Sequence, residues 1–264
     1  MESDIEIENG VYAVTTDGKL IDYNTADTTA IGVALVAGEH KFMIAKSDAT
    51  NDGSNYYLYW TKNTSDLLLL TNCSKADGTN DSGYLPKSDG TYQSTPNLSS
   101  DFTTWEAGAL SDFNGKDNTT VIAETSSNAK DMCSVLNTFN AATDGSNADK
   151  NDWYVPACGQ LALMHLNKTE INTALAQIGG TALSDEYWSS SEKSASRAWC
   201  VDLYNGYVYI GFKSNDSKVR FVRDFPVKPL NERVSDLETS KQDVISDLEE
   251  IRSGATLGAT ALQA

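Results

Sequence analysis

Histidine and cysteine are scarce in this chain of 264 residues, and this limits the chemistry that it can support. With only His40 and His165, a catalytic dyad would need folding to bring one of them to a partner. The four cysteines are far apart, with no CxxC pair and no histidine at metal-ligand spacing; they are Cys73, Cys133, Cys158 and Cys200. We therefore expect unbridged thiols, and neither a metal nor a cofactor.

Positive charge is also low, because 20 Lys and Arg stand against 37 Asp and Glu, for a formal net charge of −17 at pH 7. The basic residues are scattered along the chain. Such a surface repels nucleic acids and anionic membranes, so we expect neither as a partner. No apolar run reaches transmembrane length, and the residues after Met1 lack the basic start and apolar stretch of a secretory signal. We expect neither membrane insertion nor export by that route.

An apolar fraction of 40% is nevertheless enough to build a core. Short apolar runs separated by turn residues predict a β-meander at the start of the chain, with strands at 10–14, 19–23, 30–36 and 41–45.

A polar stretch follows, since residues 46–120 are rich in Asn, Asp, Ser, Thr and Gly and predict long loops. Within it, 48–53 and 77–83 lack the alternate acidic spacing and the closing Glu of a helix-flanked calcium loop. We interpret both as turns.

Apolar residues at helical spacing predict one helix running from Thr125 to Phe139 and a second over 160–178, with a break near 167–169. A closing strand is expected at 219–225, and Pro226 and Pro229 mark a boundary after it. The sequence thus predicts an acidic N-terminal segment, a folded domain and a C-terminal segment, at 1–9, 10–226 and 227–264.

The C-terminal segment carries an apolar seam at alternating spacings of four and three. Its positions are Leu230, Val234, Leu237, Lys241, Val244, Leu248 and Ile251. This is the heptad pattern of a coiled coil, and we expect a parallel homo-oligomer, most simply a trimer, with Lys241 as its polar seam residue. The alternative is an amphipathic helix packed on its own domain.

Two alternating runs flank Asn205-Gly206 within residues 199–212, which predicts a hairpin with a two-residue turn. In that register Tyr204 would face Tyr207 and Asp202 would face Tyr209. One face would be core, and the other would be rich in tyrosine, which suits recognition because its contact area is large and its rotamer entropy is low. The candidate ligand contacts are Asp202, Tyr204, Tyr207, Tyr209, Arg197 and Lys213. The alternative is a tyrosine-rich face covered by a neighbouring loop.

Three tryptophans belong to motif blocks and are expected in the core: Trp153, Trp188 and Trp199. Four parts of the sequence together resemble the C-type-lectin-like domain of bacterial and phage proteins: the run Trp153-Tyr154-Val155-Pro156-Ala157-Cys158-Gly159-Gln160-Leu161, the block from Gly180 to Glu192, the pair Ala198-Trp199 and the closing run 219–225. That domain also occurs in the variable proteins of diversity-generating retroelements. The resemblance covers residues 105–225 and implies an α+β fold of small mixed sheets, two helices and long loops, here followed by the coiled coil.

The tail gives a second resemblance. Residues 241–255 and 258–263 resemble segments of fibre proteins from phages of gut Bacteroides. This resemblance implies a virion fibre, made in the bacterial cytoplasm, whose head binds a glycan or protein on the host surface. The alternatives are a decoration protein that contacts only other virion proteins, and a secreted adhesin on the bacterial surface.

Catalysis is not expected, although formylglycine-generating enzymes share the broader fold. Those enzymes use a pair of reactive cysteines. Here Cys158 and Cys200 have no neighbouring basic residue in the sequence to lower a thiol pKa.

Overall fold

The computed structural model describes residues 7–16, 18–62, 75–99, 108–141 and 152–224, all within one compact unit. The predicted coiled coil with its seam from Leu230 to Ile251, and most of the acidic N-terminal segment, lie outside these residues and stay predictions. None of the helices in the described ranges has the length and apolar character that a bilayer crossing needs.

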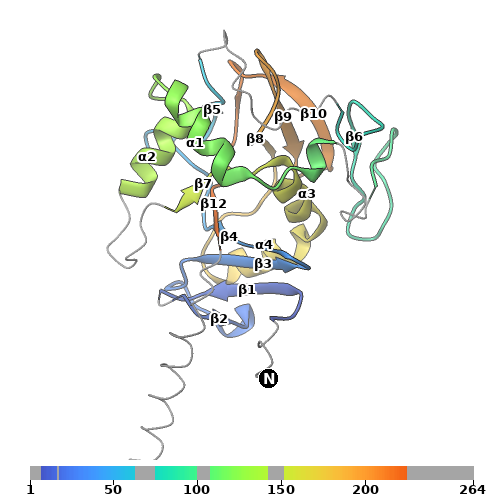
Figure 1. The fold of residues 1–264 in the computed structure, drawn as a ribbon. Helices are drawn as coiled ribbons and strands as arrows, with labels where there is room; N and C mark the ends of the chain where they lie inside the picture. Colours follow the sequence, from blue (N-terminus) through green and yellow to red (C-terminus); the bar gives the residue numbers. More distant parts are fainter. Residues whose placement is uncertain (1–6, 17, 63–74, 100–107, 142–151, 225–264) are drawn as a thin grey trace, which may run out of the picture. The chain divides into compact units, whose positions relative to one another are not determined.

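A six-stranded antiparallel sheet includes the strands β1 to β4 at the bottom of Figure 1 and extends upward through β12 and β7. Its order is β2-β1-β3-β4-β12-β7, with β1 (Gly10–Val14), β2 (Leu20–Ile21), β3 (Gly32–Ala37), β4 (His40–Ala45), β7 (Trp153–Tyr154) and β12 (Val222–Asp224). The four strands predicted at the start of the chain are confirmed as β1 to β4, but the predicted meander connection is wrong, because β3 pairs with β1 and not with β2. The predicted closing strand is β12, which pairs with β4 and so ties the end of the domain to its beginning.

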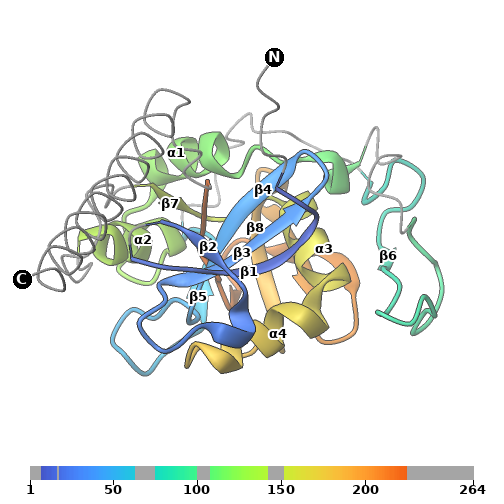
Figure 2. The ribbon, with the colours of Figure 1, turned by 90° about the horizontal axis from the view of Figure 1, so that it is seen from below.

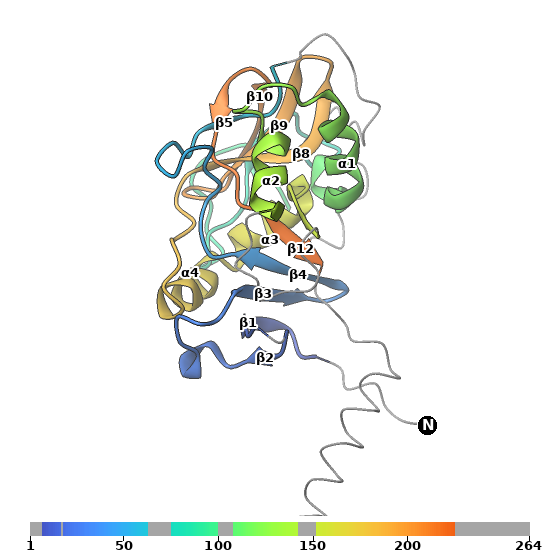
Figure 3. The same cartoon turned by 90° about the vertical axis from the view of Figure 1, so that its left-hand side faces the viewer.

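A four-stranded antiparallel sheet lies at the other end, with α3 between the two sheets (Figures 1 and 3). Its order is β6-β10-β9-β8, with β6 (Gly83–Tyr84), β8 (Glu186–Ser194), β9 (Arg197–Asp202) and β10 (Tyr207–Phe212). A third pairing joins β5 (Leu58–Tyr59) to β11 (Asp216–Ser217).

Four α-helices occur in the described residues: α1 (Gly115–Thr125), α2 (Met132–Ala141), α3 (Cys158–Leu166) and α4 (Lys168–Gln177). The predicted break in the long helix is confirmed, since α3 ends and α4 begins at Asn167. The helix α1 was not predicted, because its buried face includes polar side chains. Asn118 donates to Asp112 Oδ2 at 2.9 Å and Thr119 donates to the carbonyl of Gly115 at 2.7 Å, so neither adds to an apolar pattern.

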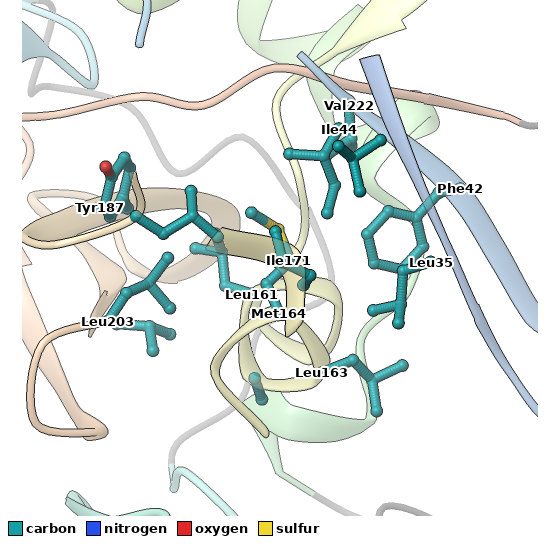
Figure 4. Packing of buried hydrophobic residues seen from close by; sticks show 14 of the residues in the cluster. Leu35, Phe42, Ile44, Leu161, Leu163, Met164, Ile171, Tyr187, Leu203 and Val222 are labelled. Atoms are coloured by element: carbon teal, nitrogen blue, oxygen red, sulfur yellow. The ribbon is translucent and has the colours of Figure 1, made fainter. Parts of the chain in front are cut away.

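Two clusters of buried residues make up the core. In the first cluster, Leu161, Leu163 and Met164 of α3 pack against Leu35 of β3 and Phe42 of β4, as Figure 4 shows. The second cluster lies on the other side of strands β1 to β4 and includes residues of α2. Figure 2 shows α3 and α4 on one side of these strands and α1 and α2 on the other.

The predicted core position of the three motif tryptophans is confirmed, since Trp153, Trp188 and Trp199 are all buried. Three thiols are buried as well, and none of those described, Cys133, Cys158 and Cys200, forms a disulfide. Burial raises the pKa of Cys133 to about 12 and raises the pKa of Cys200 well above its ordinary value. A thiol with a raised pKa is a poor nucleophile at neutral pH.

Candidate ligand-binding surface

The hairpin of β9 and β10 has a different register from the predicted one. Tyr207 pairs with Asp202, and Tyr209 with Cys200, so the turn spans the four residues 203–206. The prediction of a two-residue turn is therefore wrong. The reason is local hydrogen bonding within the turn: Asp202 Oδ1 accepts the N–H of Tyr204 at 2.8 Å, and the backbone N–H of Gly206 donates to the carbonyl of Asp202 at 2.7 Å.

The predicted assignment of side chains to the two faces of the hairpin is still correct for the strand residues. A two-residue shift in register leaves each of these side chains on the same side of the sheet. Trp199, Val201 and Val208 are buried in the first core cluster. The opposite side, which we call the outer face, carries Tyr207 and Tyr209, both half-buried. Tyr207 and Tyr209 therefore lie on the expected face, whereas Tyr204 lies in the turn and does not face Tyr207.

A row of three aromatic rings crosses the outer face. Tyr84 of β6 lies beside Tyr207, with 4.7 Å between ring centroids, and Tyr207 stacks on Tyr209 at 5.4 Å. The hydroxyl of Tyr207 donates to Ser82 Oγ at 3.3 Å, and that of Tyr209 donates to the carboxylate of Glu186. Burial and the neighbouring Cys200 and Glu186 raise the pKa of Tyr209, so its phenol stays protonated. We call Tyr84, Tyr207 and Tyr209 the tyrosine row.

A cavity of about 400 Å³ opens beside Tyr209. It lies between the outer face and the β5–β11 pair, with Trp188 and Gly211 on one wall and Tyr59 on the other. A Cβ at Gly211 would lie 2.7 Å from Cη2 of Trp188, so the contact between β10 and this indole requires glycine. The absence of a side chain at Gly211 also leaves room in the cavity.

Polar groups complete the cavity wall. The carboxylate of Glu186 accepts a hydrogen bond from Tyr209 and another from Ser217 Oγ at 3.0 Å. The ammonium of Lys62 lies 3.7 Å from the ring centroid of Tyr59 and donates to the carbonyl of Ser214 at 3.4 Å. Convergent polar groups beside aromatic rings are typical of a small-molecule binding site. Within the described ranges, no three His, Cys, Asp or Glu side chains gather as a set of metal ligands would.

The other predicted contacts do not join the tyrosine row. Tyr204 lies in the turn, and its side chain is 72% exposed. Arg197 lies at the far end of the hairpin, where its guanidinium carbon is 3.9 Å from the ring centroid of Phe212. Lys213 is 0% exposed: its ammonium pairs with buried Glu192 and lies 4.4 Å from the ring centroid of Trp60. The structure therefore does not place Lys213 on the binding surface, because the buried carboxylate holds its charge inside.

Several residues of the surface were not found from the sequence. Tyr84 and Tyr59 lie on two-residue strands inside the polar stretch, where no periodicity marks a strand. Glu186 and Lys62 line the same cavity although more than a hundred residues separate them in sequence. No pattern in the chain signals that they share a site.

Comparison with known proteins identifies the domain. Residues 58–223 match the Lcl C-terminal domain, which is C-type-lectin-like. The chain belongs to this family. All residues of the tyrosine row and of the cavity lie inside the region that matches the family, whereas the strands β1 to β4 precede it. The lectin-like resemblance is confirmed at the level of the Lcl domain, and the match extends further toward the N-terminus than the predicted 105–225.

One solved structure, a fimbrial protein from Bacteroides ovatus, is similar to the chain with a TM-score of 0.45 and 15% sequence identity. The similarity covers 83% of this chain and 49% of that protein, so the chain spans about half of its length. This likeness is too low to carry an inference about function. No curated protein sequence matches the Lcl-domain chain significantly.

Proposed function

We propose that this Lcl domain is a non-catalytic binding head and that its contact surface is the tyrosine row, the adjoining cavity and Tyr204. The observation that carries the proposal is the continuity of the row with the cavity. Three aromatic rings in mutual contact lead to a hollow with a carboxylate, an ammonium and hydroxyl groups in its wall. Interfaces are dominated by a few aromatic anchors of this kind.

The ligand class is a glycan or a protein on a cell surface. The cavity combines hydrogen-bond donors and acceptors with the rings of Tyr59 and Tyr209, which suits a neutral polar group. The ring of Tyr59 already has the ammonium of Lys62 above it, which disfavours a cationic ligand at that ring.

We propose a bacterial surface adhesin as the carrier of this head, ahead of a phage fibre. The family match supports a lectin-like head in either setting. The phage expectation depended on residues 241–263, which lie outside both the match and the described residues. The trimer, with its seam from Leu230 to Ile251, is retained as part of the proposal and would present three copies of the surface.

An array of immobilised mammalian and bacterial glycans, together with intact cells, tests the binding proposal. Tyr207→Ala and Tyr84→Ala should each weaken retention by about 1 to 3 kcal/mol, because each removes an aromatic anchor. Tyr56→Ala is the matched control, since Tyr56 is 39% exposed and lies outside the row and the cavity wall.

Unchanged retention in a correctly folded Tyr84→Ala, Tyr207→Ala double variant would exclude the tyrosine row as the contact surface. Antibody labelling of intact producing cells, compared with purified particles, separates the adhesin from the virion fibre. Label confined to particles would reverse our order of preference.

A further inference from the structure

The most exposed large aromatic side chain in the described residues lies on a turn whose backbone is fixed from several directions. Tyr204 is 72% exposed. Its own N–H is bonded to Asp202, the N–H of Leu203 donates to the carbonyl of Asp185 at 2.9 Å, and the N–H of Tyr207 donates to Asn205 Oδ1 at 2.8 Å. In exposed turns the backbone N–H groups usually bond to water, whereas here three of them bond to other protein groups.

Lys168, the first residue of α4, bonds two carbonyl groups of the turn. Its ammonium donates to the carbonyl of Leu203 at 2.6 Å and to that of Tyr204 at 3.0 Å. The same ammonium lies 5.9 Å from the ring centroid of Tyr204. Burial lowers the pKa of Lys168, and the nearby Asp202 opposes this shift. A charged donor shared by two neighbouring carbonyls restrains the backbone that carries the Tyr204 side chain.

His165 and the segment at 85–86 also contact the turn. His165, only 4% exposed, has Nδ1 3.3 Å from the carbonyl of Leu203 and Nε2 3.2 Å from that of Pro86. The N–H of Leu85 donates to the carbonyl of Gly206 at 2.8 Å. Gly206 has φ +81°, and a Cβ there would lie 2.6 Å from Nε2 of His165. The turn is thus packed between α3 and a distant loop.

We infer that Lys168 is a positioning residue, which holds the 203–206 turn so that the exposed ring of Tyr204 is presented in one orientation. This inference rests on the proposed function, because it makes Tyr204 a pre-ordered anchor of the same surface. An anchor that is ordered before binding loses less conformational entropy on association than a mobile one. Lys168 contributes through the backbone of the turn, without itself touching the ligand.

Amide hydrogen exchange tests the inference without any ligand. Lys168→Met keeps a long apolar stem and removes the donors, and it should lower the protection of the Gly206 and Leu203 amides by about tenfold or more. Lys168→Arg, which restores a charged donor, should recover most of the protection. Lys116→Met is the control, because Lys116 makes surface ion pairs with Asp152 and Asp224 elsewhere. Unchanged protection in Lys168→Met would overturn the inference.

Retention on the same glycan array then tests the consequence for binding. Lys168→Met should weaken retention about as much as Tyr204→Ala, and the double variant should add little to either, because both changes act on one contact. If Tyr204→Ala weakens retention while Lys168→Met does not, the positioning inference is wrong. If neither change affects retention but turn protection is still lost in Lys168→Met, Lys168 does hold the turn and the proposed role of Tyr204 in binding fails.

Discussion

The two faces of the β9–β10 hairpin have the same backbone and very different surroundings. On the inner face, Trp199, Val201 and Val208 are buried in the cluster that contains the apolar side of α3. On the outer face, Tyr207 and Tyr209 are half-buried, and their hydroxyls are bonded to side chains from other strands and loops. The inner face is closed by a helix, whereas the outer face is covered only in part and borders a cavity.

This difference shows what an alternating pattern determines. Alternation fixes which side chains share a face, and apolar character selects the face that enters the core. It does not fix what covers the polar face. There buried Lys213 and Trp60 pack together beyond one end of the hairpin, while Tyr204, at the turn, is exposed to solvent. The proposed contact surface therefore lies on the part of the outer face that is only partly covered.

The largest expected effect contrasts the two faces directly. Trp199→Ala should lower the free energy of unfolding by about 3 to 5 kcal/mol, because it leaves a cavity in the inner-face core. Tyr204→Ala should change it by no more than about 0.5 kcal/mol, since that side chain is exposed. Urea unfolding of both variants measures the difference. Similar destabilisation by the two changes would mean that the turn, too, is part of the core.

The next effect separates the two basic residues that the sequence analysis proposed as ligand contacts. Lys213→Met should cost about 3 kcal/mol of stability, because it leaves the buried carboxylate of Glu192 without the ammonium that it faces. Arg197→Met should cost much less, since Arg197 is only half-buried and stacks on exposed Phe212. Thermal and urea unfolding give both values.

Adding Glu192→Gln to Lys213→Met provides the check on this explanation. The double variant should recover part of the lost stability, because it removes the buried charge. No recovery would indicate that Lys213 contributes through its packing on Trp60 alone.

The smallest effect concerns pH. Burial, and then the charge of Lys168, lowers the pKa of His165 below 6.5, so the unfolded chain binds a proton at this site more readily than the folded chain. The free energy of unfolding should therefore fall as pH drops below about 6.5. His165→Gln should flatten this dependence, as measured by urea unfolding at a series of pH values above the range in which carboxylates titrate.

His40 is the control, because burial lowers its pKa as well. His40→Gln should remove a separate part of the slope, and the double variant should remove both. An unchanged slope in His165→Gln would show that this imidazole does not gain a proton on unfolding in that range.

The sequence by itself determined the strands β1 to β4, the break between α3 and α4, the buried tryptophans and the two faces of the hairpin. These features depend on neighbours along the chain, since apolar periodicity and turn residues act over a few positions. The lectin-like motifs around Trp153 and Trp188 likewise depend on short runs of residues that stay together in sequence.

Only the tertiary structure decided the hairpin register, the helix α1, the burial of Lys213 and the composition of the binding surface. Lys213 meets Glu192, Tyr209 meets Glu186 and Lys168 meets the turn at Tyr204 across the fold. Asn118 bonds Asp112 only six residues away, and local bonds within the turn set the hairpin register. A buried polar side chain is stable only where a partner satisfies it. For most of these pairs the partner lies more than twenty residues away, so three-dimensional packing alone could show where they belong.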